Sequence, residues 1–459
     1  MPHPYALLRT GGILITRTPT VPRTRYLPSS KEDIRDAGTR AHAIRIHTDV
    51  PTKKQKNQAI AFEDRARVLE QQRRHKMARS VHAYVRGNTI QFYEWLARSK
   101  KDAIPQGPPI WICGDCHVGN LGPVANAGGR VEIEIRDLDQ TVIGNPAHDL
   151  IRLALSLAMA ARGSDLPGIT TTQMVEHIMQ GYQSALLHPV ATTADAASGD
   201  NLEPIHEVLQ NALRRRWKHL AEERIDDVEP NIPLGDRFWK LSDQEREAIE
   251  KLFAEDATRK LMTQLKGRDD DAKVRVVDAA YWMKGCSSLG KLRMAVLVSI
   301  GKRSDHTYCL VDIKEAVKPA APAAKPTPSA PRMPADFAER VVAGARALSP
   351  YLGNRMLSAT LLRRPVVVRE LMPQDLKLEI DSLTPDQAIG AARFLAAVVG
   401  KAHGRQMSAA NRKRWVAELN RNRSKSLDAP NWLWTSLLQL VSEHEAAYLE
   451  HCRRYALAS

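Results

Sequence analysis

The sequence predicts an α+β protein that combines a helix-rich large part with a small part built on an antiparallel sheet. Apolar residues recur at helical spacing over long stretches of 61–270 and again after residue 372. Between residues 271 and 371, β-rich runs are separated by glycine-bearing turns. The 459 residues, 43% hydrophobic and 26% charged, suffice for two sizeable cores.

Residues 1–60 are polar and rich in Pro, Thr and Arg at first, which predicts an extended arm. Helical periodicity begins near Ala61 and runs to about Ser99. The pattern then changes between Pro109 and Asp139, where an apolar run is followed by a polar loop and by the alternating segment VEIEI. We expect a strand, a loop, a short strand, a turn and a strand in this region.

Residues 147–162 are apolar nearly all round, which predicts a buried helix with Gly163 as its C-cap. Further helices are expected near 171–188, 202–224, 243–265, 336–348, 385–407 and 432–455, and β-runs within 273–316 and at 365–371. The segment Val317–Pro334 is rich in Pro and Ala, so we expect a solvated linker with few packed contacts.

The formal net charge is +15, from 67 Lys and Arg against 52 Asp and Glu, which favours an anionic partner such as a nucleotide. The basic residues are dispersed and lack interleaved aromatic residues, which disfavours nucleic acid. No apolar run reaches membrane-spanning length and the N-terminus lacks a signal-peptide core, so we expect a cytoplasmic protein without membrane association. The five cysteines do not resemble a disulfide framework.

The motif CGDCHVGN places Asp115 five residues before Asn120 on a loop that leaves an apolar strand. Phosphoryl transfer requires a carboxylate to orient or deprotonate the attacking hydroxyl and oxygen ligands for Mg²⁺. A D-x-x-x-x-N loop supplies both from one turn. The same residues spell C-x-x-C-H, a haem-attachment or half-zinc pattern, but no export signal and no second cysteine pair accompany it. We therefore expect these cysteines to be small buried residues.

The strand VEIEI ends in two carboxylates, Asp137 and Asp139, seventeen and nineteen residues after Asn120. An isolated D-x-D more often lies in a solvated turn or caps a helix. Because Asp115 and Asn120 stand nearby in the sequence, a Mg²⁺ site is favoured here.

A glycine loop is predicted at GCSSLGKLRM, where Gly285 and Gly290 flank Ser287 and Ser288 before a β-run. Glycines let backbone amides approach phosphates closely, although hairpin turns need them too. The following strand ends at Lys314.

The segments GDCHVGN and RDLDQTVIGNPAHDL resemble the catalytic and metal-binding segments of aminoglycoside-phosphotransferase-type kinases. This resemblance implies that Asp115 is the catalytic base, that Asn120 and Asp137 are metal ligands, and that His117 supports the loop. It also implies that Asp149 is a structural helix aspartate.

The chain more closely resembles the bacterial family called domain of unknown function 2252, which belongs to the kinase-like superfamily. The shared features are spread over roughly residues 77–455 and include AYVRGNTIQF, GDCHVGNLG, RDLDQTVIGNPAHDLIRLALS, GCSSLG, DIKEA, ERVVAGARAL, VVVREL and LAAVVGKAH. The resemblance implies a two-lobed fold that binds ATP and Mg²⁺.

The resemblance also implies that Lys314 contacts the α- and β-phosphates. Its expected carboxylate partner is Glu339, with Glu315 as the competitor, although adjacent strand residues point to opposite faces. The backbone from Glu370 to Met372 would hold adenine as a hinge.

The order of these motifs is the reverse of that in an ordinary kinase, which predicts a circular permutation. The helical lobe with the catalytic loop would be 61–270, the nucleotide-covering lobe 271–371, and the rest of the helical lobe 372–459. Lys314 and Asp137 should then face one cleft, roofed by the glycine loop and floored by Asp115 and Asn120.

The first hypothesis is therefore an ATP- and Mg²⁺-dependent phosphotransferase that acts on a small hydroxyl-bearing acceptor. Nucleotidyl (AMP) transfer and a non-catalytic nucleotide-binding scaffold are the alternatives. The sequence does not name the acceptor or the oligomeric state, although the basic charge suggests an anionic acceptor.

Overall fold

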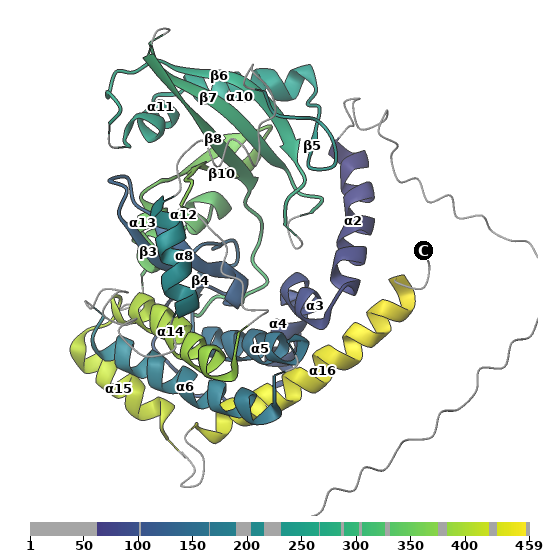
Figure 1. Ribbon diagram of the computed structural model, residues 1–459, viewed down its shortest axis with the longest axis vertical. Helices are drawn as coiled ribbons and strands as arrows, with labels where there is room; N and C mark the ends of the chain where they lie inside the picture. The colour runs from purple at the N-terminus through teal and green to yellow at the C-terminus, as the bar shows by residue number, and fades with distance from the viewer. Residues whose placement is uncertain are drawn as a thin grey trace, which may run out of the picture. The chain divides into compact units, whose positions relative to one another are not determined.

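The computed structural model describes residues 62–100, 102–164, 166–189, 203–214, 231–265, 267–285, 289–302, 305–325, 331–374, 383–421 and 429–455. All of these belong to one compact unit (Figure 1). The arm predicted for residues 1–60 lies outside the described residues. The protein is a mixed α+β protein with antiparallel sheets, as the sequence predicts.

The periodic stretch that begins near Ala61 forms three helices, α2 (Phe62–Ala78), α3 (Val81–Gly87) and α4 (Thr89–Arg98). Ser80 separates the first two, since its hydroxyl accepts a hydrogen bond from the Ala83 amide and begins α3. Asn88 lies between α3 and α4. The polar caps therefore divide one apolar pattern into three short helices.

Two small two-stranded sheets follow. β1 (Ile110–Ile112) pairs with β4 (Val142–Gly144), and β2 (Leu121–Ala125) pairs with β3 (Val131–Ile135). A 3₁₀ turn, η1 (Val118–Asn120), lies directly before β2. The expected order of strand, loop, short strand, turn and strand is confirmed, and β4 adds a partner that no pattern indicated.

The helical core forms around α5 (Ala147–Gly163), α6 (Gly168–Leu187) and α14 (Pro385–Gly404). α6 and α14 pack at backbone contact, because a Cβ on Gly181 would lie 2.0 Å from the Arg393 carbonyl oxygen. The predicted C-cap of α5 was wrong: the helix continues through Gly163 and Ser164 is the cap. The Ser164 amide donates to the Ala161 carbonyl, so no left-handed glycine is required.

The main sheet has six antiparallel strands in the order β5-β6-β7-β8-β10-β9. Their bounds are β5 Phe238–Trp239, β6 Val274–Trp282, β7 Arg293–Lys302, β8 Asp305–Glu315, β9 Met356–Leu361 and β10 Arg364–Leu371. α10 (Asp243–Ala254) and α11 (Asp256–Thr263) cover one face (Figure 1). The single helix expected at 243–265 is thus two, because Glu255 adopts an extended backbone between them.

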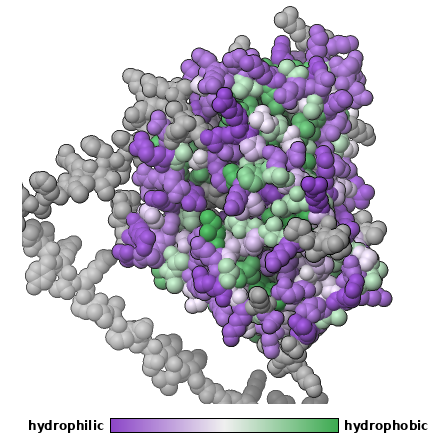
Figure 2. Space-filling view, turned by 180° about the vertical axis from the view of Figure 1, so that it is seen from behind, coloured by the Kyte–Doolittle hydropathy of each residue, from purple (hydrophilic) through white to green (hydrophobic). Residues whose placement is uncertain are grey.

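The remaining helices are α8 (Glu203–Arg214), α12 (Phe337–Leu348), α13 (Pro350–Gly353), α15 (Ala409–Leu419) and α16 (Asn431–Tyr455). α16 contacts α2, α3 and α5 (Figure 1). Figure 2 shows a face on which hydrophilic side chains surround scattered hydrophobic ones. Within the described residues, no helix is both long and apolar enough to span a membrane.

In the part that the structure describes, Val317–Pro334 has no helix or strand, and most of its residues are exposed or half-buried. Ala321 is 4% exposed and belongs to the helical core. The Ala320 amide donates to the Gln140 side chain at 2.7 Å, and the Ala324 amide donates to the Ile143 carbonyl at 2.7 Å. Small alanine side chains let this irregular segment lie close to the loop before α5.

Candidate functional site

Asp149, in the first turn of α5, fixes the loop that follows β1. Its carboxylate accepts hydrogen bonds from the amides of Cys113 at 2.7 Å and Gly114 at 3.0 Å, and it lies 3.1 Å from His403 Nε2. Asp149 is fully buried. The expected structural role is therefore visible in its contacts. Cys113 and Cys116 are free thiols and are buried, as the sequence predicts.

Asp115 and Asn120 meet at the same loop. Arg152 Nε, from α5, donates to Asp115 Oδ1 at 2.8 Å, and Arg152 Nη2 donates to the Val85 carbonyl at 2.6 Å. Asn120 Nδ2 donates to the Asp115 carbonyl at 3.0 Å. This bond leaves Asn120 Oδ1 as the side-chain atom that can act as a ligand. Asp115 Oδ2 accepts no hydrogen bond from the described residues.

His117 is 5% exposed, and its Nε2 lies 3.9 Å from Asp115 Oδ2. Burial, followed by the positive charges of Arg86 and Arg152, holds the pKa of His117 well below its usual range. The ring is therefore neutral near pH 7. A neutral imidazole beside Asp115 can orient the loop without competing for a proton.

Asp137 and Asp139, just after β3, both contact the Lys314 ammonium. Lys314 Nζ lies 3.2 Å from Asp137 Oδ2 and 3.3 Å from Asp137 Oδ1, and it also forms an ion pair with Asp139 Oδ2. Lys314 is at the end of β8, 177 residues away along the chain from Asp137. The structure thus brings Lys314 and Asp137 together, as the sequence predicts.

Burial alone would raise the pKa of Asp137, but Lys314, Arg369 and Arg293 outweigh it and hold that pKa below its usual range. Burial and the neighbouring Asp137 charge raise the pKa of Asp139. Asp137 and Asp139 in turn raise the pKa of Lys314, despite its burial. The ammonium and the Asp137 carboxylate are therefore both charged near neutral pH.

A second ionic cluster supports Lys314 from within the sheet. Leu310, Asp312 and Lys314 alternate along β8 and so share one face. Arg293 on β7 makes two hydrogen bonds to Asp312, at 2.9 and 2.6 Å, and Arg369 on β10 lies 3.3 Å from the same carboxylate. Asp312, Lys314 and Arg369 line a cavity of about 20 Å³ together with Asp137 and Asp139.

The structure does not bring Glu339 to Lys314. Glu339 is exposed in the first turn of α12, and within the described residues Lys314 makes its ion pairs with Asp137 and Asp139. The next residue, Arg340, faces the acidic segment instead and donates to the carbonyl of Asp139 at 2.9 Å. Glu315 points away, as strand geometry predicts, and pairs with Arg364 at 2.8 Å.

Both glycines of the predicted glycine loop have left-handed backbones, with φ +91° at Gly285 and +88° at Gly290. Lys76 on α2 lies 3.4 Å from the Gly285 carbonyl oxygen. A Cβ on Gly290 would lie 3.5 Å from the Ala66 carbonyl oxygen. α2 therefore borders this loop. Ser287 and Ser288 lie outside the described residues.

At the predicted hinge, the contacts of Glu370 are internal. Its carboxylate makes a two-point ion pair with Arg268, with both distances 2.7 Å, and its carbonyl accepts from Arg355 Nη1 at 3.0 Å. Arg355 also donates to the Ala125 carbonyl at 2.7 Å. Met372 follows β10 and is half-buried. The side chain and the carbonyl of Glu370 therefore both bind arginines of neighbouring segments.

The donors near Lys314 suit a hard cation such as Mg²⁺. No three His, Cys, Asp or Glu side chains form a ready-made metal site within the described part of the chain. Mg²⁺ is usually held by only one or two protein carboxylates together with substrate phosphates and water. Asp137 and Asp139 converge on one cation, the Lys314 ammonium, so they are the two carboxylates of this region that could hold such an ion.

Four arginines of the site were missed by sequence reasoning, namely Arg152, Arg293, Arg340 and Arg369. The one available signal was for Arg152, a single charge in the middle of the apolar run LIRLALSLAMA. A charge buried in such a helix must have a partner.

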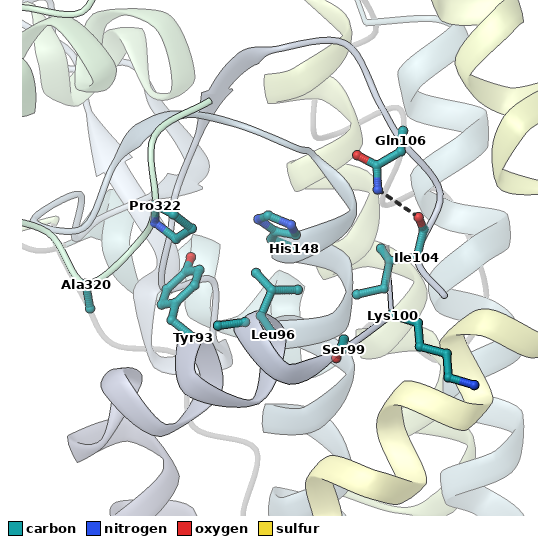
Figure 3. A pocket seen from close by; sticks show the side chains of 10 residues that line it. Tyr93, Leu96, Ser99, Lys100, Ile104, Gln106, His148, Ala320 and Pro322 are labelled. Atoms are coloured by element: carbon teal, nitrogen blue, oxygen red, sulfur yellow. Dashed lines mark hydrogen bonds between the residues drawn. The ribbon is translucent and has the colours of Figure 1, made fainter. Parts of the chain in front are cut away.

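A larger cavity, of about 460 Å³, is lined by residues of α4, of the start of α5 and of the segment after β8. Tyr93, Leu96 and His148 line it, together with Ala320 and Pro322 of the Pro/Ala-rich segment (Figure 3). The Tyr93 hydroxyl donates to the Gly114 carbonyl at 2.6 Å, which ties this wall to the loop. Asp115, Asp137 and Lys314 do not line it, so the cavity is distinct from the charged cluster.

The family model for an uncharacterized protein conserved in bacteria, domain of unknown function 2252, matches residues 65–454. The chain therefore belongs to this family. Comparisons with curated proteins and with solved structures found no match.

Proposed function

We propose that this protein is an ATP- and Mg²⁺-dependent phosphotransferase with a kinase-like, two-lobed and circularly permuted fold. The observation that carries the proposal is the meeting of Lys314 with Asp137 and Asp139. A lysine from the central sheet and carboxylates at a strand end are the groups that kinase-like sites place at the triphosphate and its metal ion. They come from segments in the order that a permutation requires.

The contacts support the following roles. Asp137, Asp139 and Asn120 Oδ1 would hold Mg²⁺, which supplies positive charge against the phosphate oxygens when it is bound. Lys314 would turn to the triphosphate, since its two aspartates then have the metal as their counter-ion. The glycine loop at Gly285 and Gly290 would cover the phosphates with its backbone amides.

Asp115 would act as the general base. Its Oδ1 is held by Arg152, so Oδ2 is the atom that can accept the proton of the acceptor hydroxyl. The acceptor oxygen then forms a bond to the γ-phosphorus while the bond to the bridging oxygen of the leaving ADP breaks. Arg152 keeps the carboxylate oriented through this step.

Product analysis with ATP labelled at the γ- or α-phosphate tests the proposal. We expect γ-label to leave ATP, either to water slowly or to an acceptor in a bacterial metabolite extract, with ADP as the other product. Transfer of α-label would indicate nucleotidyl transfer instead. Tight ATP binding without release of either label would indicate the non-catalytic scaffold.

The substitution Asp115→Asn should lower turnover by roughly 10²–10⁴-fold, the usual contribution of a positioned general base. Nucleotide affinity should change little, because the asparagine Oδ1 can still accept the hydrogen bond from Arg152. Turnover and calorimetric affinity for Mg·ATP are measured on the same sample. The control is the exposed Asp64→Asn on α2. Turnover of D115N equal to that of D64N would remove Asp115 from the mechanism.

A further inference from the structure

Arg86 is an arginine without a counter-ion beside the catalytic loop. It lies in the last turn of α3 and is half-buried. Its guanidinium rests on Gly119, because a Cβ at that position would lie 3.0 Å from both Arg86 Cζ and Nη2. No hydrogen bond or ion pair joins Arg86 to any other part of the chain that the structure describes. The unpartnered atom that is buried is Nε, so the two terminal nitrogens keep contact with solvent.

The groups beside Arg86 do not neutralise its charge. Arg152 is 1% exposed and its buried Nη1 has no hydrogen-bond partner among the described residues. The same holds for Nδ1 of His117, which is 5% exposed and feels the charges of Arg86 and Arg152. The acid of this loop, Asp115, is already paired with Arg152. The charge of Arg86 is therefore left uncompensated, and an incoming anion could pair with it.

The position of Arg86 separates it from the triphosphate groups. Lys314, Asp137 and Asp139 pair with one another on the sheet side of the site. Arg86 instead comes from α3 and lies on the Asp115–Asn120 loop, where the acceptor hydroxyl must approach the base. A guanidinium presents paired donors that match a carboxylate or a phosphate.

We propose that Arg86 binds an oxyanion of the acceptor, so that the substrate class is a hydroxyl-bearing compound with a phosphate or carboxylate group. This inference rests on the proposed phosphotransferase function, since it gives the acceptor a place beside Asp115. It assigns Arg86 to substrate recognition and leaves the nucleotide to Lys314 and the glycine loop.

The test uses the full chain saturated with Mg²⁺ and the non-hydrolysable analogue AMP-PNP, titrated in a calorimeter with inorganic phosphate and, separately, with citrate. The wild-type protein should bind at least one of these anions with a dissociation constant below about 10 mM. Arg86→Gln should weaken that binding at least about tenfold, the loss of one charge-assisted contact. AMP-PNP affinity should stay within about twofold of the wild-type value.

Two further variants sharpen the result. Gly119→Ala displaces the Arg86 guanidinium with little backbone strain, because Gly119 does not adopt a left-handed φ, and it should weaken anion binding as Arg86→Gln does. The control Arg162→Gln removes an exposed arginine from the last turn of α5 and should change nothing. Circular dichroism verifies that each variant is folded.

Three outcomes would overturn the inference: no anion binding by the wild-type protein, equal anion binding in R86Q, or a parallel loss of AMP-PNP affinity in R86Q. The last would show that Arg86 serves the nucleotide. If AMP-PNP does not bind at all, the proposed function fails by itself. The anion titration is then repeated with the Lys314→Ala variant and with the double variant that also carries Arg86→Gln. Weaker anion binding by the double variant would still support an anion site at Arg86. Equal anion binding by the two variants would contradict it.

Discussion

Gly114 sets the shape of the loop that carries Asp115. Its φ is +75°, and a Cβ there would lie 2.1 Å from the Gln140 carbonyl oxygen. The amide of Gly114 is bound by Asp149 and its carbonyl by Tyr93. The loop is therefore held from both sides, and the close approach of Gln140 leaves no room for a side chain.

We expect Gly114→Ala to lower the free energy of unfolding by about 2–5 kcal/mol, the sum of left-handed strain and overpacking. The matched control is Gly129→Ala. Gly129 has φ +83°, but no atom would lie within 4 Å of a Cβ added there, so this variant should lose only the strain of about 1–2 kcal/mol. Urea unfolding measures both variants. An equal loss of unfolding free energy in both variants would show that the loop moves to accommodate the added Cβ of Gly114→Ala.

At this scale the sequence singled out two aspartates and a lysine of the candidate site but missed its arginines. Asp115, Asp137 and Lys314 stand out because carboxylates at a strand end and a lysine ending an apolar strand are local patterns. The partners of these charges depend on which segments meet in space. Arg152 reaches Asp115 from the middle of an apolar helix, and Arg340 rather than Glu339 faces the acidic segment.

At the scale of elements, α2 joins parts of the molecule that are distant in sequence. Arg65 makes a two-point buried ion pair with Glu245 of α10, at 2.6 and 2.9 Å. At the other end of α2, the hydroxyl of Tyr448 on α16 donates to the Ala78 carbonyl at 3.1 Å. The sequence predicted this helix from its periodicity, but a single long-range ion pair leaves no local pattern.

The substitution Arg65→Met should lower the free energy of unfolding by about 3–5 kcal/mol, because it leaves the Glu245 carboxylate buried without its cation. Lys251→Met removes an ion pair of α10 whose side chains are 74% and 64% exposed, and it should cost less than about 1 kcal/mol. Chemical unfolding monitored by circular dichroism compares the two. A similar small cost for both would mean that Glu245 finds water or another partner.

The segment Val317–Pro334 shows what composition leaves out at this scale. Pro- and Ala-rich segments usually stay solvated because they bury little area. Here the backbone supplies specific contacts, because the amides of Ala320 and Ala324 donate hydrogen bonds to Gln140 and Ile143, and Ala321 is buried. Composition carries no information about such backbone partners.

At the scale of the whole molecule, buried histidines link stability to pH. His444 of α16 is fully buried, bonds to the Leu440 carbonyl through Nδ1 at 2.8 Å, and leaves Nε2 without a partner among the described residues. Burial, with a smaller effect of Arg152, lowers the pKa of His444 to about 4. Burial likewise lowers the pKa of His148, at the start of α5, to about 4.

The sign of the effect follows from proton binding. An unfolded histidine takes up its proton near pH 6.5, whereas these two stay neutral in the folded protein until about pH 4. Between those values the unfolded chain binds more protons, so stability is complete above about pH 6.5 and falls as the pH drops. Each histidine should contribute a slope of up to about 1.4 kcal/mol per pH unit.

We therefore expect His444→Asn to make stability less dependent on pH between about pH 6.5 and pH 4.5, with the slope reduced by close to one proton. The asparagine amide can donate to the Leu440 carbonyl in place of Nδ1, which favours a folded variant. Urea unfolding across this pH range gives the slope, which is independent of any uniform loss of stability. The control His177→Asn removes a half-buried histidine of α6 that makes the same contact to the carbonyl four residues earlier, and the slopes of the two variants are compared. An unchanged slope in H444N would show that His444 is protonated without unfolding, so that the core around α5 and α16 opens to water before the chain unfolds.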